Sequence, residues 1–183
     1  RRDLRATRHS VPARIFPPRR YRVVARCSGM GRRHRIPEMD YAAPGCYFVT
    51  IVTAERRAFL GRVRDAALIP SPIGSVVEAA WLAIPTFRPW VRLGTFTLMP
   101  DHIHGVLSWI AVPRNRPGSL SIVVNGMKCD ATRRARAAGL LRPEEPLWQR
   151  SFDVRFILSR TGSIRVHRYI LNNPRKAWVK RRR

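Results

Sequence analysis

The chain has 183 residues, 45% of them hydrophobic, which is enough for one domain with a proper core. Lysine and arginine total 36 against 11 acidic residues, and the resulting formal net charge of +25 is far outside the range of an ordinary soluble enzyme. The excess favours a polyanionic partner, above all nucleic acid bound with strong salt dependence. The alternative explanation is that the richness in arginine partly reflects the base composition of the coding DNA.

Cysteine usage and hydropathy place further limits on the class of protein. The three cysteines, Cys27, Cys46 and Cys129, are odd in number and widely spaced. We therefore expect neither a disulfide framework nor a zinc knuckle, and a reducing cytosol is the default. No apolar run approaches the roughly 20 residues that span a bilayer, so no membrane partner is expected.

Three segments are expected along the chain. Residues 1–31 carry scattered arginines with little periodicity, which predicts a basic, poorly ordered extension. Residues 32–178 are expected to form the folded domain, and residues 179–183 a basic tail.

The domain is predicted to begin with a strand and a helix. Residues 46–53 (CYFVTIVT) are β-branched and aromatic, with apolar side chains on both faces, and this predicts a central strand. Apolar residues recur at helical spacing over residues 72–84, up to Pro85, and predict an amphipathic helix that packs on the sheet.

Residues 95–110 (TFTLMPDHIHGVLSWI) predict two short antiparallel strands joined by a Met-Pro-Asp turn. Because side chains alternate faces along a strand, His102 and His104 point the same way. Two neutral imidazoles on one face can bind a metal ion. The pattern alone fits ordinary hydrogen-bonded histidines equally well, because two ligands do not define a site.

A second helix is predicted over residues 119–138, with Ser119 as its N-cap and Gly139 after its end. Its later turns carry a basic cluster, for which phosphate contacts are predicted and a solvated face is the alternative. The members of this cluster are Lys128, Arg133, Arg134 and Arg136.

A last helix is predicted from residue 164 to about residue 172, ended by Pro174. Tyr169 and Asn173 lie four residues apart and would share a helix face, although the position before a proline favours a cap for Asn173. Alone, Tyr169 is interpreted as a half-buried aromatic. The order β-α-β-β-α followed by this helix predicts an α+β fold, with an antiparallel sheet and helices mainly on one face.

The motif MPDHIHG at residues 99–105 resembles the Met-Pro-Asn-His-x-His-Gly signature of the single-tyrosine HUH transposases. The chain is most similar to the REP-associated tyrosine transposases of bacteria, over about residues 32–178. Further segments agree in order, namely YAAPGCYFVTIVT, GSVVEAAWLAIP, SLSIVVNGMK, LWQRSF and RYILNNP.

The resemblance implies a ferredoxin-like sheet, with His-x-His on a central strand and the tyrosine on a C-terminal helix. It implies that His102, His104 and Asn173 bind Mg²⁺ or Mn²⁺, and that Tyr169 is the nucleophile. The ion would polarise the scissile phosphate, and attack by the tyrosine would leave a 5′-phosphotyrosine and a free 3′-hydroxyl. The implied substrate is single-stranded DNA beside hairpin-forming, REP-like palindromes, cleaved by a monomer or homodimer at the bacterial nucleoid.

Some positions are extra candidates, and others depart from the family pattern. Trp148, Gln149 and Arg150 are predicted to face DNA, with Trp148 and Phe152 as core aromatics in the alternative interpretation. The segment after Arg150 looks altered or one residue short. Asp101 stands where the family has Asn. Residues 158–168 contain a glycine and no acid, which lowers the helix propensity before the nucleophile.

Three functions remain open at this point. The main prediction is a metal-dependent DNA transposase that cleaves and transfers single strands. The second is a decayed or domesticated relative that binds hairpins without cleaving them. The third is a phosphoesterase that activates water on the metal, and it would tolerate Tyr169→Phe.

Overall fold

The computed structural model describes residues 44–109 and 119–181, so the predicted N-terminal extension, residues 1–31, lies outside the described residues. A four-stranded antiparallel sheet in the order β4-β5-β1-β6 forms the centre of the fold. Its strands are β1 (Gly45–Val52), β4 (Arg92–Met99), β5 (His102–Trp109) and β6 (Asp153–Phe156). The longer helices are α1 (Pro72–Leu82), α3 (Leu120–Ala137) and α4 (Arg160–Arg181).

Helix α1 joins β1 to β4, and helix α3 joins β5 to β6. The resulting β-α-β-β-α-β order, with both helices on one face, is the ferredoxin-like arrangement. Smaller elements are added between β1 and β4, namely η1 (Ala54–Arg56), the hairpin β2 (Gly61–Arg64) and β3 (Ala67–Pro70), and α2 (Ile84–Phe87). The predicted α+β class and antiparallel sheet are confirmed.

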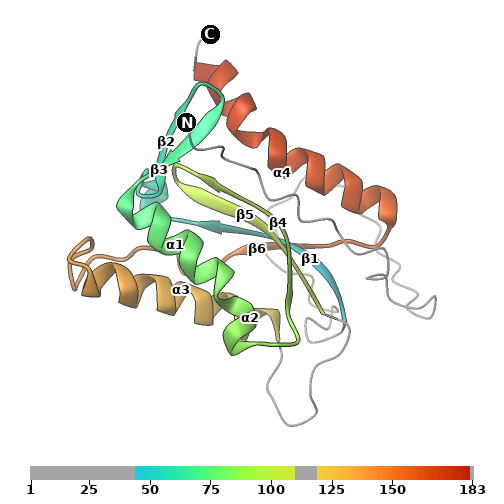
Figure 1. Ribbon diagram of the computed structural model, residues 1–183, viewed down its shortest axis with the longest axis horizontal. Coiled ribbons are helices and arrows are strands. Elements are labelled where there is room, and N and C mark those ends of the chain that lie inside the picture. The colour runs from blue at the N-terminus through green and yellow to red at the C-terminus, as the bar shows by residue number, and fades with distance from the viewer. Residues whose placement is uncertain (1–43, 110–118, 182–183) are drawn as a thin grey trace, which may run out of the picture.

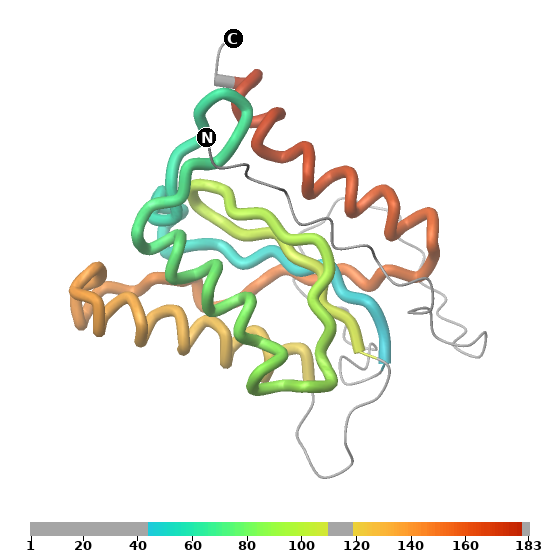
Figure 2. The backbone as a smooth tube through the Cα atoms, in the orientation of Figure 1, coloured from blue at the N-terminus to red at the C-terminus, as the bar shows by residue number. Residues whose placement is uncertain are grey.

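Three layers are visible in Figure 1, with α1 and α3 on one face of the sheet and α4 on the other. Alternation along β1 explains this, because Tyr47 and Val49 pack into the cluster under α1 and α3 while Phe48 packs with Ile170 of α4. The tube in Figure 2 shows α4 returning across the strands after β6. The histidines of β5 therefore face whatever α4 presents.

Two helices begin and end close to their predicted limits. The hydroxyl of Ser71 accepts a hydrogen bond from the Gly74 amide at 3.0 Å, and Ser119 does the same for Ile122 at 3.4 Å. Gly139 follows α3 with a φ of 68°, the left-handed conformation that suits glycine after a helix.

Helix α4 is longer than predicted at both ends. The Ser159 hydroxyl accepts a hydrogen bond from the Gly162 amide at 3.0 Å, so the helix begins four residues earlier than expected. The prediction that Pro174 ends the helix is wrong. Proline removes only the hydrogen bond to the Ile170 carbonyl, and packing of buried Ile170 and Pro174 keeps the helix on the sheet. Residues 179–181, expected in the basic tail, belong to α4, and residues 182–183 lie outside the description.

The sequence did not predict β6 or the β2–β3 hairpin. Each of these strands has four residues, too few to establish a period of two. Strand β6 is nevertheless important, because it pairs with β1 and places Asp153 opposite Thr50. No helix within the described residues has the length and apolar character needed to cross a membrane.

Candidate active site

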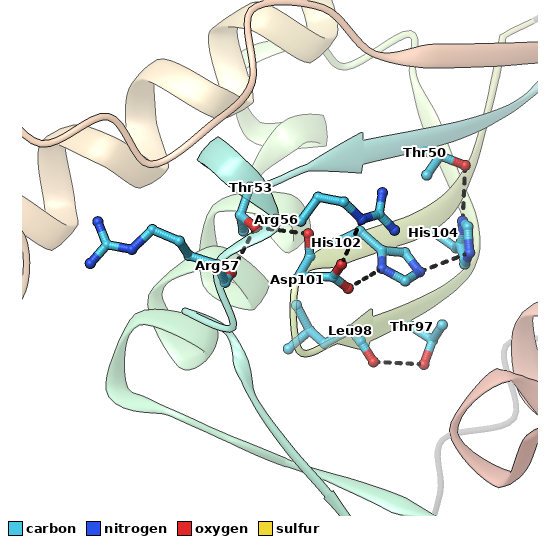
Figure 3. Close-up of polar contacts among 9 residues, drawn as sticks. All are labelled: Thr50, Thr53, Arg56, Arg57, Thr97, Leu98, Asp101, His102 and His104. Carbon is cyan, nitrogen blue, oxygen red and sulfur yellow. Dashed lines mark hydrogen bonds and ion pairs between the residues drawn. The ribbon is translucent and has the colours of Figure 1, made fainter. Parts of the chain in front are cut away.

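Two histidine rings converge on the face of the sheet that α4 covers. His102 and His104 are alternate residues of β5, and their Nε2 atoms are 3.2 Å apart. The rings meet nearly edge to face, with an interplanar angle of 73°. Figure 3 shows both imidazoles directed toward each other. The predicted common face is therefore confirmed by the geometry.

Asp101 fixes the orientation of His102. One carboxylate oxygen lies 2.6 Å from Nδ1 of His102, and the other pairs with Nε of Arg56 at 3.1 Å. A carboxylate only accepts, so Nδ1 of His102 carries a proton, and the neutral form of the ring keeps the lone pair on Nε2. The turn itself is held because both the amide and the hydroxyl of Thr53 donate to the Asp101 carbonyl, at 3.0 and 2.8 Å (Figure 3).

Thr50 performs the corresponding task for His104. Its hydroxyl oxygen is 2.9 Å from Nδ1 of His104, directly across the β1–β5 pairing. Burial, together with the neighbouring His102, lowers the pKa of His104 to about 3. His104 is thus a neutral imidazole near pH 7. The tautomer in which Nδ1–H donates to Thr50 leaves Nε2 as a free electron pair donor.

Tyr169 lies on α4 above these rings. Its ring centroid is 5.3 Å from that of His104 and 6.0 Å from that of Phe48. The side chain is 41% exposed, so it is in contact with the site and also with solvent. The ammonium of Lys176 is 5.4 Å from the centroid of the tyrosine ring. The structure thus brings Tyr169 and the histidine pair together from segments 65 residues apart in sequence (169 minus 104).

Helix α4 is anchored on both sides of Tyr169. Two residues earlier, Nδ1 of His167 hydrogen-bonds the hydroxyl of Thr95 on β4. One residue later, Ile170 is fully buried beside Phe48. These contacts position the tyrosine, and sequence reasoning missed both Thr50 and Thr95, because each depends on a non-local pairing.

The residues present fit a divalent cation. Adjacent ligands of an octahedral ion with bonds of about 2.1 Å lie roughly 3.0 Å apart, close to the 3.2 Å between the two Nε2 atoms. Within the described residues, no group of three His, Cys, Asp or Glu side chains is arranged to hold a metal ion. A third protein ligand would therefore have to be of another type.

Asn173 supplies a candidate for that third ligand. Its Nδ2 atom is buried and has no hydrogen-bond partner in the parts of the chain that the structure describes. Amide oxygen and nitrogen exchange places by a half turn of the side chain, so the same position can present an oxygen. Amide oxygens suit Mg²⁺ and Mn²⁺. The single turn of helix between Tyr169 and Asn173 puts both on the side of α4 that meets the sheet.

The predicted basic cluster of α3 lies on the other face of the sheet. Lys128 is only 8% exposed, and its ammonium donates to the carbonyls of Gln149 and Arg150 at 2.7 and 3.3 Å. Burial lowers the pKa of this lysine. Arg133 and Arg134 both pair with Asp130, at 2.6 and 2.7 Å. Lys128 therefore does not share an exposed face with the arginines, which corrects the predicted placement.

The segment after α3 is divided between core and surface. Trp148 and Phe152 are buried in the core cluster, and the indole of Trp148 donates to the Lys128 carbonyl at 3.2 Å. Gln149 and Arg150 are exposed, and the Gln149 amide donates to the Val52 carbonyl at the end of β1. A role of these residues in DNA binding stays a prediction. The burial of Trp148 agrees with the alternative interpretation, in which it is a core aromatic.

Comparison with solved structures identifies the fold. A REP-associated tyrosine transposase bound to a REP hairpin aligns with a TM-score of 0.56 and 19% identity, covering 78% of this chain and 74% of that one. The chain has the fold of a REP-associated tyrosine transposase. A candidate transposase from Deinococcus radiodurans aligns at 21% identity over 75% of this chain and 97% of that one, with a TM-score of 0.48.

Sequence comparison gives one distant relative. A protein of uncharacterized function from Haemophilus influenzae is 24% identical over 160 residues, which is 78% of this chain and 87% of that protein. No protein-family model matches the sequence. The fold-level likeness agrees with the ferredoxin-like arrangement described above.

Proposed function

We propose that the chain is a metal-dependent DNA transposase that cleaves single-stranded DNA through Tyr169. One observation carries the proposal, which is the convergence of two Nε2 atoms at 3.2 Å beneath a tyrosine ring 5.3 Å from His104. A buried structural histidine pair does not need a partly exposed tyrosine beside it. The net charge of +25 supports a polyanionic substrate.

Each residue has a role in the proposed reaction. His102, His104 and Asn173 would hold Mg²⁺ or Mn²⁺, and the bound ion would supply charge neutralisation at the scissile phosphate. The Tyr169 oxygen forms a bond to phosphorus, and the bond from phosphorus to the 3′-oxygen breaks. The products are a 5′-phosphotyrosine and a free 3′-hydroxyl. Attack of another 3′-hydroxyl on that phosphotyrosine reverses the step and joins new DNA ends.

The proposed substrate is a single strand next to a hairpin-forming palindrome. The structural neighbour that is bound to a REP hairpin supports this choice, as does the sequence resemblance. We also propose that residues 32–178 make up the catalytic domain, acting as a monomer or homodimer. Residues Gln149 and Arg150 are retained as proposed DNA contacts near the end of β1.

Covalent trapping tests the function. The protein is incubated with labelled hairpin oligonucleotides and Mn²⁺ or Mg²⁺ and run on a denaturing gel, where we expect a slowly migrating adduct. Tyr169→Phe should abolish it while keeping the ring contacts with His104 and Phe48, so folding and hairpin binding serve as its controls. His102→Ala and a chelator should abolish it as well.

Two other outcomes would replace the proposal. Hairpin binding without any adduct, under every metal condition, would indicate a non-catalytic binding protein. Metal-dependent cleavage that survives Tyr169→Phe would indicate a hydrolytic phosphoesterase that uses activated water.

A further inference from the structure

Helix α4 presents a surface of unusual charge. Its 22 residues include no acid. Its cationic residues are Arg160, Arg165, Arg168, Arg175, Lys176, Lys180 and Arg181. The ion pairs of Asp65, Asp101, Asp130 and Glu145 all go to cations outside α4. Within the described residues, these acids therefore leave the positive charges of the helix uncompensated.

Some of these cations align with the tyrosine. Residues Arg165, Tyr169, Asn172, Lys176 and Lys180 follow one another at intervals of four, three, four and four, which places them in one stripe along the helix. All five are exposed. The ends of the stripe are 15 residues apart (180 minus 165), or about 22 Å at the rise of a helix. Arg165 and Lys176 lie on either side of Tyr169 along it.

The surface beside the stripe has room for a bound chain. A pocket of about 460 Å³ is lined by Asn172, Arg175, Lys176, Val179 and Lys180. Val179, which lines this pocket, is apolar and 47% exposed. A row of cations along the backbone path is the electrostatic part of the pattern by which proteins bind single strands without sequence preference.

We propose that this stripe is the track for the phosphate backbone of the single strand that reaches Tyr169, with Lys176 as the cation beside the attacked phosphate. The inference rests on the proposed function, because the tyrosine defines where the strand must pass. Charge complementarity decides the occupant. A second copy of α4 would bring like charges together, and a polyanion is attracted along the whole stripe.

Helix α3 provides the matched control, because the sequence predicts phosphate contacts for its arginines and the two predictions can be compared directly. Arg133 and Arg136 are exposed helical arginines on the opposite face of the sheet. Arg133 is paired with Asp130, and Arg136 donates to the Glu145 carbonyl at 3.3 Å. Removing these two charges changes the net charge as much as removing Arg165 and Lys176, so the comparison separates position from total charge.

The test measures the salt dependence of binding to a labelled, unstructured single-stranded oligonucleotide. The slope of log K against log salt is negative, and each lost phosphate contact should reduce its magnitude by about 0.7 for a single strand. For Arg165→Gln/Lys176→Gln we therefore expect a slope smaller in magnitude by about 1.4, and binding about 25-fold weaker at 0.1 M salt. For Arg133→Gln/Arg136→Gln we expect the wild-type slope.

Three results would overturn the inference. The first is a wild-type slope for the α4 variant, and the second is an equal loss in the α3 control. The third is binding to anionic phosphatidylglycerol vesicles that the α4 substitutions weaken while the slope for DNA stays unchanged, which would assign the stripe to a lipid surface. Thermal unfolding of both variants confirms that exposed substitutions left the fold intact.

The outcome is separable from that of the proposed function. Tyr169→Phe should keep the wild-type slope while losing the adduct. If the wild-type protein forms no adduct but the variants show the expected slopes, the track on α4 is supported and the transferase function is contradicted. If the protein forms the adduct but the α4 variant binds with the wild-type slope, the transferase function is supported and the track on α4 is contradicted.

Discussion

Helices α3 and α4 are both rich in arginine and lysine, but the surroundings of these charges differ between the two faces of the sheet. On α3, Lys128 is buried against main-chain carbonyls, and Arg133 and Arg134 share the carboxylate of Asp130. On α4 there is no acid at all, and the exposed cations lie beside Tyr169. The number of basic residues therefore does not by itself give the exposed positive surface, which also depends on where the acids lie.

The same difference appears in the neighbours of each helix. On the tyrosine side, the carboxylate of Asp101 contacts both His102 and Arg56. Surface ion pairs such as those of Asp130 contribute less than about 1 kcal/mol each, but they reduce the field that an approaching phosphate experiences. Substitutions on α3 should thus mainly change stability, whereas those around α4 should mainly change binding and catalysis.

The largest expected effect in this comparison concerns the two lysines. Lys128→Ala removes a buried donor to two carbonyls and the packing of its stem, so we expect a loss of about 2–3 kcal/mol in the free energy of unfolding. Lys176→Ala removes an exposed cation and should change that free energy by less than about 0.5 kcal/mol. Urea unfolding of both variants measures the difference. Equal losses would contradict the assignment of one lysine to structure and the other to binding.

The next largest effect compares Asp101 with Asp130 and concerns the affinity for Mn²⁺. Asp101→Asn keeps an acceptor for Nδ1 of His102 but removes the charge and the pairing with Arg56. Because such supporting contacts change metal affinity by about 10–100-fold, we expect about tenfold weaker binding of Mn²⁺, measured by calorimetric titration. Asp130→Asn should leave Mn²⁺ affinity unchanged and should instead free Arg133 and Arg134. An equal loss of Mn²⁺ affinity in both variants would show that Asp101 acts only through net charge.

Local patterns predicted much of the site. Strand alternation placed His102 and His104 on one face, and helical spacing placed Asn173 one turn after Tyr169. Thr50 could not be found in this way, because its contact with His104 depends on the register of β1 against β5, which is set by pairing between distant segments. Asp101 was noticed only as a departure from the family pattern, and its two partners became clear from the folded turn.

The helical spacing of the basic residues also contains structural information that their charge alone does not give. Lys128 follows Val124 by four residues and precedes Ala131 by three, and these spacings put it on the buried stripe of α3. The stripe on α4 has a regular spacing too, but a helix predicted to end near residue 172 excluded Lys176 and Lys180. Pro174 does not end α4, because burial of its neighbours on the sheet offsets the cost of one lost hydrogen bond.

The smallest expected effect sets a glycine of α3 against one of α4. Gly126 lies inside α3, where an added Cβ would meet no atom within 4 Å, so Gly126→Ala should stabilise the fold by about 0.4–1 kcal/mol through helix propensity. At Gly162 the new Cβ would lie 3.2 Å from the Ser159 hydroxyl that caps α4, so part of that gain is lost as the cap shifts. Urea unfolding should therefore rank Gly126→Ala above Gly162→Ala. The reverse order would mean that the first turn of α4 tolerates a shifted cap, and that the tyrosine helix is held by Thr95 and Ile170 rather than by its own N-terminus.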